Sequence, residues 1–329
     1  MGRLLVLAAE RNVDLQYVLQ FLLVPVPLSI ASPDEVMAKT NKSALFDVLE
    51  TKVKNHGLPN SVSAYIIDGQ FLLHSLPSNL PPSYGGLART VLEHCVKSVS
   101  KSIHLIFDDY PQPSIKGQER DRRGIDERTF VITGPEQRRV PRDLNDALRS
   151  RSFKKQLPAF LAVEWVNPSY AETFADKEII LDVPGECYSF VADNGVVHRR
   201  TVDGLQNNHE EADTKVCLHA YFVENTRPQG DIVVRATDTD IAVILLYHCH
   251  SFTSRLWMEV GMSAKNNRRF INLTAIAKEI GPGLCSALPA FHAFTGSDLH
   301  ILFCEKRKGS TVQNHGKPNS IPGCFCTNG

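Results

Sequence analysis

Short apolar runs and amphipathic stretches alternate along the chain from residue 62 onward. The segments Ser63–Ile67, Ile103–Phe107 and Ile232–Val234 have the length and composition of buried strands, and Leu87–Lys97 has helical spacing between the first two. Strands that alternate with helices are typical of a parallel sheet covered by helices. We therefore predict a three-layer α/β fold, with a central, mostly parallel sheet and helices on both faces.

An antiparallel hairpin is predicted at one edge of this sheet. Ile179–Val183 and Tyr188–Ala192 have strand composition, and Asp193-Asn194-Gly195 leads from the second of them into Val196-Val197. An Asn-Gly pair between apolar runs is a strong signal for a tight hairpin turn. We expect this hairpin to be an antiparallel edge on an otherwise parallel sheet.

Further helices are predicted on either side of the hairpin, at Leu144–Arg149, Phe153–Val166 and Leu273–Ile280. Gly281-Pro282-Gly283 ends the last of these, and another helix begins near Leu284, because glycine and proline interrupt helices. Together with the strands, these elements indicate a globular domain at residues 58–308.

The two ends of the chain are predicted to differ from this domain. Residues 1–57 form a helical lead-in, with helical patterns at Leu4–Leu23, after Ser32-Pro33-Asp34-Glu35 and at Lys42–Lys54. Residues 309–329 are rich in Gly, Asn, Pro and Ser, so we expect a disordered tail. The chain starts inside a helical pattern, which indicates a fragment of a longer reading frame.

Composition limits the classes of function. The 329 residues are 43% hydrophobic, enough for a large core, and the basic and acidic residues number 36 each. With no global positive charge, a nucleic-acid partner has to be bound by a local patch. The apolar run Leu19–Ile30 is too short to span a membrane and contains Pro25 and Pro27. The eight cysteines form no CxxC pair and no secretory signal is present, so we predict an intracellular protein, nuclear or cytoplasmic, with reduced thiols and no membrane partner.

Carboxylates recur where predicted strands end. Asp68 follows the first strand, Asp108 follows the second, and Asp238 and Asp240 follow Ile232–Val234. The carboxyl ends of parallel strands meet at one edge of a sheet, which is where open α/β sheets bind ligands. Crowded carboxylates repel one another, and a divalent cation relieves that repulsion. The alternative is that these acids only solvate loops and cap helices.

A further acidic group belongs to the same pattern. In His209-Glu210-Glu211-Ala212-Asp213-Thr214-Lys215, the carboxylates precede a helix-like span of about one crossover length, and the strand Ile232–Val234 comes after it. A βαβ unit has this organisation and delivers side chains to the carboxyl edge of a sheet. We therefore add Glu211 and Asp213 to the predicted site. His209 and His219 lie near these acids, and we expect supporting or capping roles for them.

The most basic stretch of the chain follows directly after Asp109. It contains Lys116, Arg120, Arg122 and Arg123. Cations beside a metal site can hold a polyanionic substrate such as nucleic acid. Because Glu119 and Asp121 dilute the charge, a solvated helical face remains the alternative.

These motifs carry a family resemblance. Asp68 in IIDG, Asp108 in IFDDY, Glu211 and Asp213 in EEAD, the DTD pair and Asp298 in FTGSD follow the order of the flap-endonuclease (XPG-like) branch of the PIN-like nucleases. The chain resembles more closely the open reading frames of transposon-rich animal genomes that carry HEEADT, DTD and an LPAxHAxTG-acid block. The similarity covers about residues 1–308 for those reading frames and about 62–300 for the nucleases.

The resemblance implies a PIN-like domain that hydrolyses phosphodiesters in DNA or RNA with two metal ions, Mg²⁺ or Mn²⁺. It implies one metal cluster of Asp68, Asp108, Glu211 and Asp213, and a second of Asp238, Asp240 and Asp298. Lys116 and one of Arg120, Arg122 or Arg123 would match the basic residues over the scissile phosphate. Hard oxygen ligands favour Mg²⁺ or Mn²⁺ over zinc.

One departure from the family pattern keeps a second function open. After Asp298, Glu305 and Arg307 stand where the family has turn glycines that grip duplex DNA, and a side chain resists the positive φ of such a turn. A catalytically degenerate PIN-like domain that binds nucleic acid or protein is therefore the alternative.

A phosphatase-like hydrolase is a third possibility. Asp238-Thr239-Asp240 after a strand resembles the nucleophile loop of haloacid-dehalogenase-like phosphatases, although Ala242 departs from that pattern and Asp68 and Asp108 would have no role.

A further short motif has the composition of a metal ligand set, His248-Cys249-His250. We interpret it as the polar end of a strand, since alternate side chains of a strand point to opposite faces.

Overall fold

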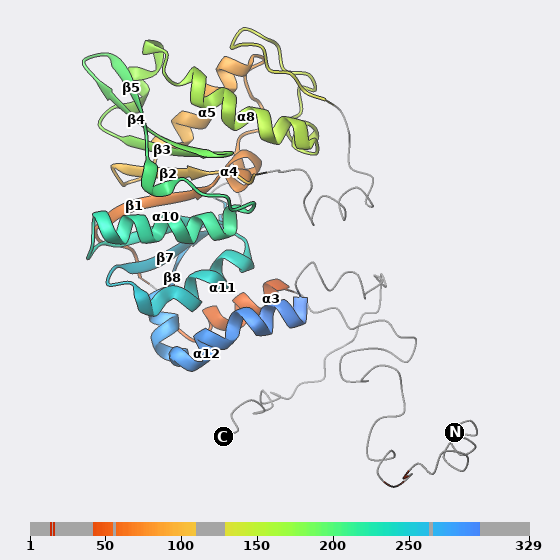
Figure 1. Cartoon of the computed structure of the whole chain (residues 1–329), viewed down its shortest axis with the longest axis vertical. Coiled ribbons are helices and arrows are strands. Elements are labelled where there is room, and N and C mark those ends of the chain that lie inside the picture. Colours follow the sequence, from red (N-terminus) through yellow and green to blue (C-terminus); the bar gives the residue numbers. More distant parts are fainter. Residues whose placement is uncertain are drawn as a thin grey trace. The chain divides into compact units, whose positions relative to one another are not determined.

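The computed structural model describes residues 42–54, 57–109, 129–262 and 266–296, together with residues 14 and 16. Residues Thr40–Ser297 form one compact unit. Its centre is an eight-stranded sheet with the strand order β5-β4-β3-β2-β1-β6-β7-β8 (Figure 1). The strands are β1 (Val62–Asp68), β2 (Ser102–Ile106), β3 (Glu178–Val183), β4 (Glu186–Asp193), β5 (Val196–Thr201), β6 (Asp231–Arg235), β7 (Arg255–Val260) and β8 (Arg269–Asn272).

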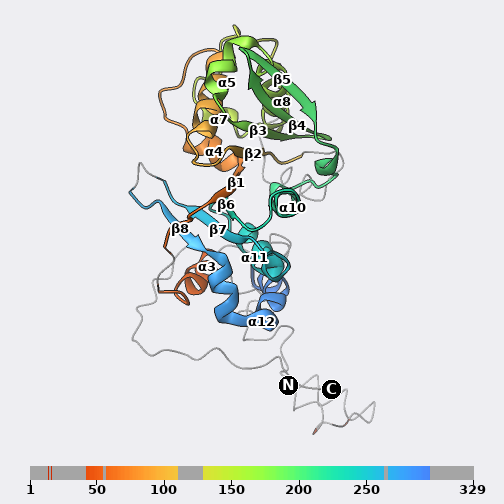
Figure 2. The same cartoon turned by 90° about the vertical axis from the view of Figure 1, so that its left-hand side faces the viewer.

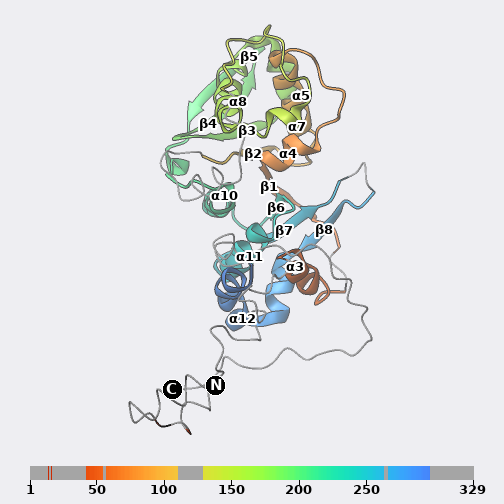
Figure 3. The same ribbon diagram turned by 90° about the vertical axis from the view of Figure 1, so that its right-hand side faces the viewer.

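Helices connect the strands and cover both faces of the sheet. They are α3 (Lys42–Glu50), α4 (Gly69–Ser75), α5 (Tyr84–Val96), α7 (Leu144–Ala147), α8 (Arg151–Glu164), α9 (Ala171–Phe174), α10 (Ala212–Thr226), α11 (Thr239–His248) and α12 (Leu273–Gly296), with short 3₁₀ turns η1 (Pro168–Tyr170), η2 (Asp203–Leu205) and η3 (Cys249–Ser251). Figures 2 and 3 show α4, α5, α7 and α8 beside the strands from β2 to β5, and α3, α10, α11 and α12 beside β1, β6, β7 and β8.

The alternation of side chains along the strands explains this layering. In β1, Tyr65 and Ile67 belong to the core under α5 and α8, whereas Ala64 and Ile66 belong to the core under α10, α11 and α12. Successive residues of a strand point to opposite faces, so a strand that is apolar throughout is covered on both sides. The predicted three-layer α/β architecture is therefore confirmed.

The order of the parallel strands creates a switch point beside β1. From β1 the chain moves outward to β2 and β3 with α5 and α8 on one face, and it returns through α10, on the other face, to β6, which pairs with β1 on its free side. In open α/β sheets, ligands bind outside the carboxyl ends of the strands at such a reversal of strand order. The ends of β1 and β6 therefore mark the expected ligand site.

Several sequence predictions are confirmed in detail. The chain turns at Asn194 and Gly195, both with positive φ, and β4 and β5 pair antiparallel with Asp193 opposite Val196. Within α12, Gly281 has φ 79° and separates two helical segments, as the Gly-Pro-Gly sequence predicts. A second antiparallel pair, β7 with β8, lies at the other edge and was not predicted.

The interpretation of residues 248–250 as the end of a strand is wrong. His248 is the last residue of α11, and Cys249 begins the turn η3. The run Ile241–Leu246 packs in the core on the face of α10 and α12, and such a short apolar run has no period that separates a buried helix from a strand. The sequence signal for a helix at this position was the capping residue Asp238. Its side chain accepts a hydrogen bond from the Asp240 amide, and the helix starts there.

The helix α3 packs in the same unit as the sheet. Its side chains Phe46 and Leu49 are buried in the core with residues of α11 and α12. Apart from residues 14 and 16, the predicted helix Leu4–Leu23 lies outside the described residues, and so does the predicted disordered tail. In the part of the chain that the structure describes, no helix has the length and apolar character needed to cross a membrane.

Candidate metal centre at the carboxyl edge of the sheet

Three of the predicted acids follow three neighbouring parallel strands. Asp68 is the last residue of β1, Asp108 comes shortly after β2, and Asp238 comes shortly after β6. Because β2 and β6 both pair parallel with β1, these residues lie at one edge of the sheet. This is the edge of the switch point.

Three carboxylates lie close enough to share a metal ion. Asp213, Asp238 and Asp240 each offer an oxygen, and these oxygens all lie within 4.8 Å of one another. Asp213 belongs to the first turn of α10, and the other two residues lie at the start of α11. The family resemblance implies two separate clusters, with Asp213 in one and Asp238 and Asp240 in the other, and the structure brings members of both together.

The electrostatics of Asp213 reflect this crowding. Burial, followed by the negative charges of Asp238, Asp240, Glu211 and Asp108, raises the pKa of Asp213 to about 8. The charged form is disfavoured because each of these carboxylates repels it and because little water solvates it. A cation placed among these oxygens would reverse this effect.

Asp68 belongs to the same electrostatic group. Burial raises the pKa of its carboxyl group to about 7; a hydrogen bond from the Phe71 amide opposes the rise, and the charges of Asp108 and Asp238 add to it. The six acids predicted from the sequence and described by the structure therefore converge at one edge. They are Asp68, Asp108, Glu211, Asp213, Asp238 and Asp240.

The capping alternative is correct in part. Oδ1 of Asp68 accepts hydrogen bonds from the amides of Gln70 (2.8 Å) and Phe71 (3.3 Å) at the start of α4. Oδ1 of Asp108 accepts one from the Ala212 amide (2.8 Å) at the start of α10. These contacts orient the carboxylates, and a carboxylate has two oxygens, so a cap and a metal ligand are compatible in one side chain.

The remaining predicted site residues cannot be placed in this way. Asp298 and the basic residues Lys116, Arg120, Arg122 and Arg123 lie outside the described residues. Their roles as a metal ligand and as phosphate contacts stay predictions.

A histidine that the sequence analysis assigned no role lies at the site. Nε2 of His292, from the second half of α12, is 2.5 Å from Oδ1 of Asp240. The side chain of His292 is only 8% exposed. In the sequence, His292 belongs to the LPAFHAFTG segment, which is part of the family resemblance. That position was the available signal for a role of His292 at the site.

A second group of possible metal ligands lies nearby in the interior. Asp182, Cys187 and His219 each offer a ligand atom, and these atoms also lie within 4.8 Å of one another. All three residues are buried. Two sets of side chains could therefore hold a metal ion, and their surroundings separate them.

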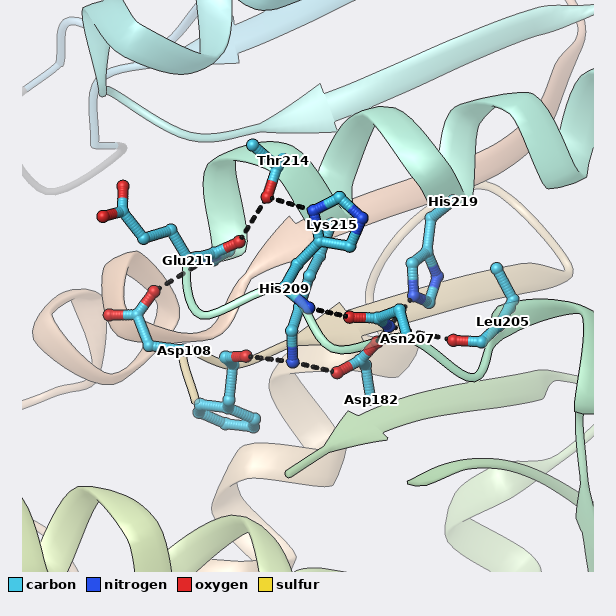
Figure 4. Close-up of polar contacts among 11 residues, drawn as sticks. Asp108, Asp182, Leu205, Asn207, His209, Glu211, Thr214, Lys215 and His219 are labelled. Carbon is cyan, nitrogen blue, oxygen red and sulfur yellow. Dashed lines mark hydrogen bonds and ion pairs between the residues drawn. The ribbon is translucent and has the colours of Figure 1, made fainter. Parts of the chain in front are cut away.

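A lysine ammonium already lies beside the second set. Nζ of Lys215 lies 2.6 Å from Oδ1 of Asp182 and 3.1 Å from the Phe107 carbonyl oxygen (Figure 4). The Lys215 and Asp182 side chains are 2% and 1% exposed. An ammonium group at this distance satisfies the carboxylate and repels a second cation.

Hydrogen bonds occupy the other oxygen of Asp182. His219 Nε2 lies 3.1 Å and Asn207 Nδ2 lies 3.1 Å from Oδ2 (Figure 4). Burial, followed by the charge of His219, lowers the pKa of His104 well below its usual value, and burial lowers the pKa of His219. Both imidazoles are therefore neutral, so each carries one N–H.

The hydrogen-bond directions follow from this neutrality. His219 donates from Nε2 to Asp182, so its Nδ1 accepts from Nδ1 of His104 at 2.8 Å. The Nε2 of His104 then accepts from Ser102 Oγ at 3.4 Å. Every donor in this series of hydrogen bonds points toward Asp182.

The thiol of this second set is also unsuited to a metal. Burial and the charge of Asp182 raise the pKa of the Cys187 thiol, which keeps it protonated. A divalent metal would displace these contacts, so we assign the candidate metal centre to Asp213, Asp238 and Asp240.

His209 has a local contact that fits its expected supporting role. Its Nδ1 lies 2.9 Å from Thr214 Oγ1, and Thr214 Oγ1 donates to the Glu211 carbonyl oxygen at 3.1 Å (Figure 4). The His209 side chain thus stabilises the turn that leads into α10.

Comparisons with known proteins gave no match. No family model matched the chain, and neither did any curated protein or solved structure.

Proposed function

We propose that this protein is a metal-dependent nuclease that hydrolyses phosphodiester bonds in DNA or RNA. The observation that carries the proposal is the convergence of six carboxylates at the switch point of a parallel sheet. The resemblance of the motifs to flap-endonuclease-like PIN domains supports the substrate class.

The donor set fits Mg²⁺ or Mn²⁺. Asp213, Asp238 and Asp240 offer carboxylate oxygens, which these hard cations prefer, and no thiol or imidazole belongs to that set. The raised pKa values of Asp213 and Asp68 mean that the folded chain holds carboxyl groups whose ionised forms need a positive partner. Ions held by these carboxylates would supply activation of a water molecule and stabilisation of the leaving oxygen of a phosphodiester.

The protein groups orient this chemistry. Asp108 holds the first amide of α10, which places the adjacent residues Glu211 and Asp213 beside α11. Asp238 starts α11 and thereby positions Asp240 within the same turn. The predicted Lys116 and Arg120, with Arg123, would bind the phosphate backbone.

The test begins with the full chain and a matched pair of variants. Labelled single-stranded, hairpin and flap oligonucleotides of DNA and RNA are incubated with Mg²⁺, with Mn²⁺ or with EDTA. We expect metal-dependent cleavage by the parent and at least about 100-fold slower cleavage by Asp238→Asn, since a ligand oxygen carrying charge is lost. Asp193→Asn, in the exposed hairpin turn, is the control and should cleave at the parent rate.

Each other outcome identifies a different function. Metal binding without cleavage of any oligonucleotide would support the degenerate PIN-like domain. Hydrolysis of a small phosphomonoester without oligonucleotide cleavage would support the phosphatase-like alternative. A folded chain that binds neither metal would contradict the candidate centre itself.

A further inference from the structure

The buried ion pair of Lys215 and Asp182 lies directly behind the candidate metal centre. Lys215 is two residues after Asp213 on α10, and its ammonium donates to the carbonyl oxygen of Phe107, the residue before Asp108. Its other partner, Asp182, belongs to the end of β3. One ammonium group therefore connects the end of β2, the end of β3 and the first turn of α10 (Figure 4).

The direction of this contact determines where Asp213 points. Two residues apart on an α-helix, side chains differ by about 200° around the axis. Lys215 reaches toward Asp182 on the β3 side of α10, so Asp213 projects to the other side, where Asp238 and Asp240 lie. Rotation of α10 about its axis would move Asp213 away from its neighbours.

Additional contacts fix the same junction but do not set this rotation. The Asp109 amide donates to the Glu210 carbonyl oxygen at 2.7 Å, and the Ala212 amide donates to Asp108 at 2.8 Å. Both involve the backbone at the beginning of the helix. Lys215 is the contact one turn further along, and His219, one more turn along α10, donates to the same Asp182. Contacts separated along a helix define its orientation where a single one does not.

We propose that Lys215, anchored by Asp182, is a positioning residue for the metal centre. It holds α10 in the rotation that presents Asp213 to Asp238 and Asp240. The proposal rests on the proposed function, because it assigns Lys215 to the same metal-binding edge. It predicts that the pair contributes to metal affinity in addition to its contribution to stability.

The experiment separates these two contributions. Lys215→Met leaves Asp182 buried without its ammonium partner, so we expect a melting temperature lower by about 10 °C. The double variant Lys215→Met/Asp182→Asn removes both charges and keeps an oxygen for His219 and Asn207, so stability should return close to that of the parent. Its Mn²⁺ affinity, measured by electron paramagnetic resonance titration, should stay at least about tenfold weaker.

Lys177 provides a matched control. Its ammonium, like that of Lys215, has two oxygen partners, here the backbone carbonyls of Ser98 (2.8 Å) and Ser100 (2.9 Å), but these residues precede β2 and lie at the amino edge of the sheet. Lys177→Met should lower stability and leave Mn²⁺ affinity at the parent value. A double variant that binds Mn²⁺ as tightly as the parent would overturn the positioning role alone. A folded parent that does not bind Mn²⁺ would overturn the proposed function and this inference together.

Discussion

The two ends of β6 carry carboxylates in opposite circumstances. Asp231 opens the strand at the amino edge of the sheet, and Asp238 follows it at the carboxyl edge. Asp231 is fully buried, yet it has a partner for each oxygen; Asp238 is exposed and belongs to a group of acids. Burial alone therefore does not distinguish a structural carboxylate from a functional one.

The contacts of Asp231 show how a buried carboxylate is stabilised. It accepts hydrogen bonds from Arg255, from the Trp257 indole at 2.9 Å and from the amides of Asn60 and Ser61. Burial raises the pKa of Asp231, but these hydrogen bonds outweigh it and hold the pKa below the usual value. The protein supplies the full set of donors, so no ligand is required.

At the carboxyl edge, one buried acid has a cation among its partners, whereas two others are crowded by further carboxylates. Asp182 has Lys215, His219 and Asn207. The pKa values of Asp213 and Asp68 are instead raised, because burial and neighbouring carboxylates act in the same direction. The difference in partners, from Asp231 to Asp213, is what distinguishes a carboxylate that stabilises the fold from one that is suited to bind a cation.

The largest expected effect is the loss of stability when Asp231, whose oxygens all have donors within the protein, is replaced. Asp231→Ala leaves the Trp257 indole, the two amides and Arg255 without their acceptor, so the free energy of unfolding should fall by about 3–5 kcal/mol. Urea unfolding in EDTA measures this loss. Mn²⁺ affinity of the folded fraction should equal that of the parent, and a variant that keeps its stability but loses metal affinity would reverse the comparison.

Replacement of Asp213, which is crowded by other carboxylates, should raise the stability of the metal-free protein instead of lowering it. Without metal at pH 8, Asp213→Asn removes a repulsive charge, so the variant should melt at a higher temperature than the parent. With free Mn²⁺ at 100 times its dissociation constant, the parent should gain about 2.7 kcal/mol and the variant much less. Thermal melts over a Mn²⁺ titration, with Asp193→Asn as the control, measure both effects. A variant that is less stable than the parent in EDTA would mean that Asp213 is satisfied within the protein.

Three acids of the candidate metal centre were predictable because they follow strands. A strand end is local in the sequence, and parallel strands bring their ends to one edge whatever the rest of the fold does. Asp68, Asp108 and Asp238 satisfy this rule. The strands from β1 to β6, the hairpin and the interrupted helix α12 were predictable for the same reason, since their signals lie within a few residues.

The ion pair behind the centre was not predictable in this way. Lys215 and Asp182 are separated by 33 residues, and no periodicity connects them. Each has a sign of burial in the sequence: Asp182 interrupts an apolar strand, and Lys215 precedes the apolar residues Val216 and Cys217. Those signs mark charged residues that need a partner, but only the tertiary structure identifies the partner.

Metal affinity should rise with pH. The folded-state pKa values of Asp213, about 8, and Asp68, about 7, both lie above the ordinary aspartate value of 3.8, so without metal their ionisation destabilises the fold increasingly from about pH 4 to pH 8. Metal binds the ionised form, and the ionised fraction of a group with a pKa of about 8 rises about 50-fold between pH 6 and pH 8. Mn²⁺ affinity of the parent should increase by about that factor. Calorimetric titrations at the two pH values measure it, and Asp213→Asn should show a smaller increase; equal affinities at both pH values would exclude Asp213 as a ligand.

The smallest effect concerns the histidine beside the centre. With Nε2 of His292 at 2.5 Å from Oδ1 of Asp240, the imidazole restricts the rotation of this carboxylate, and its other oxygen then faces a defined direction. Groups that orient a metal ligand typically contribute about tenfold or more to metal affinity. His292→Leu should therefore weaken Mn²⁺ binding about tenfold, whereas His292→Gln keeps an N–H donor at a similar position and should retain most of the affinity. His248→Leu is the control, because His248 contacts Tyr221 at the far end of α11 and should not affect the metal. If the Gln and Leu variants of His292 bind Mn²⁺ equally, the hydrogen bond to Asp240 does not orient a metal ligand, and His292 belongs with Asp231 among the residues that serve the fold.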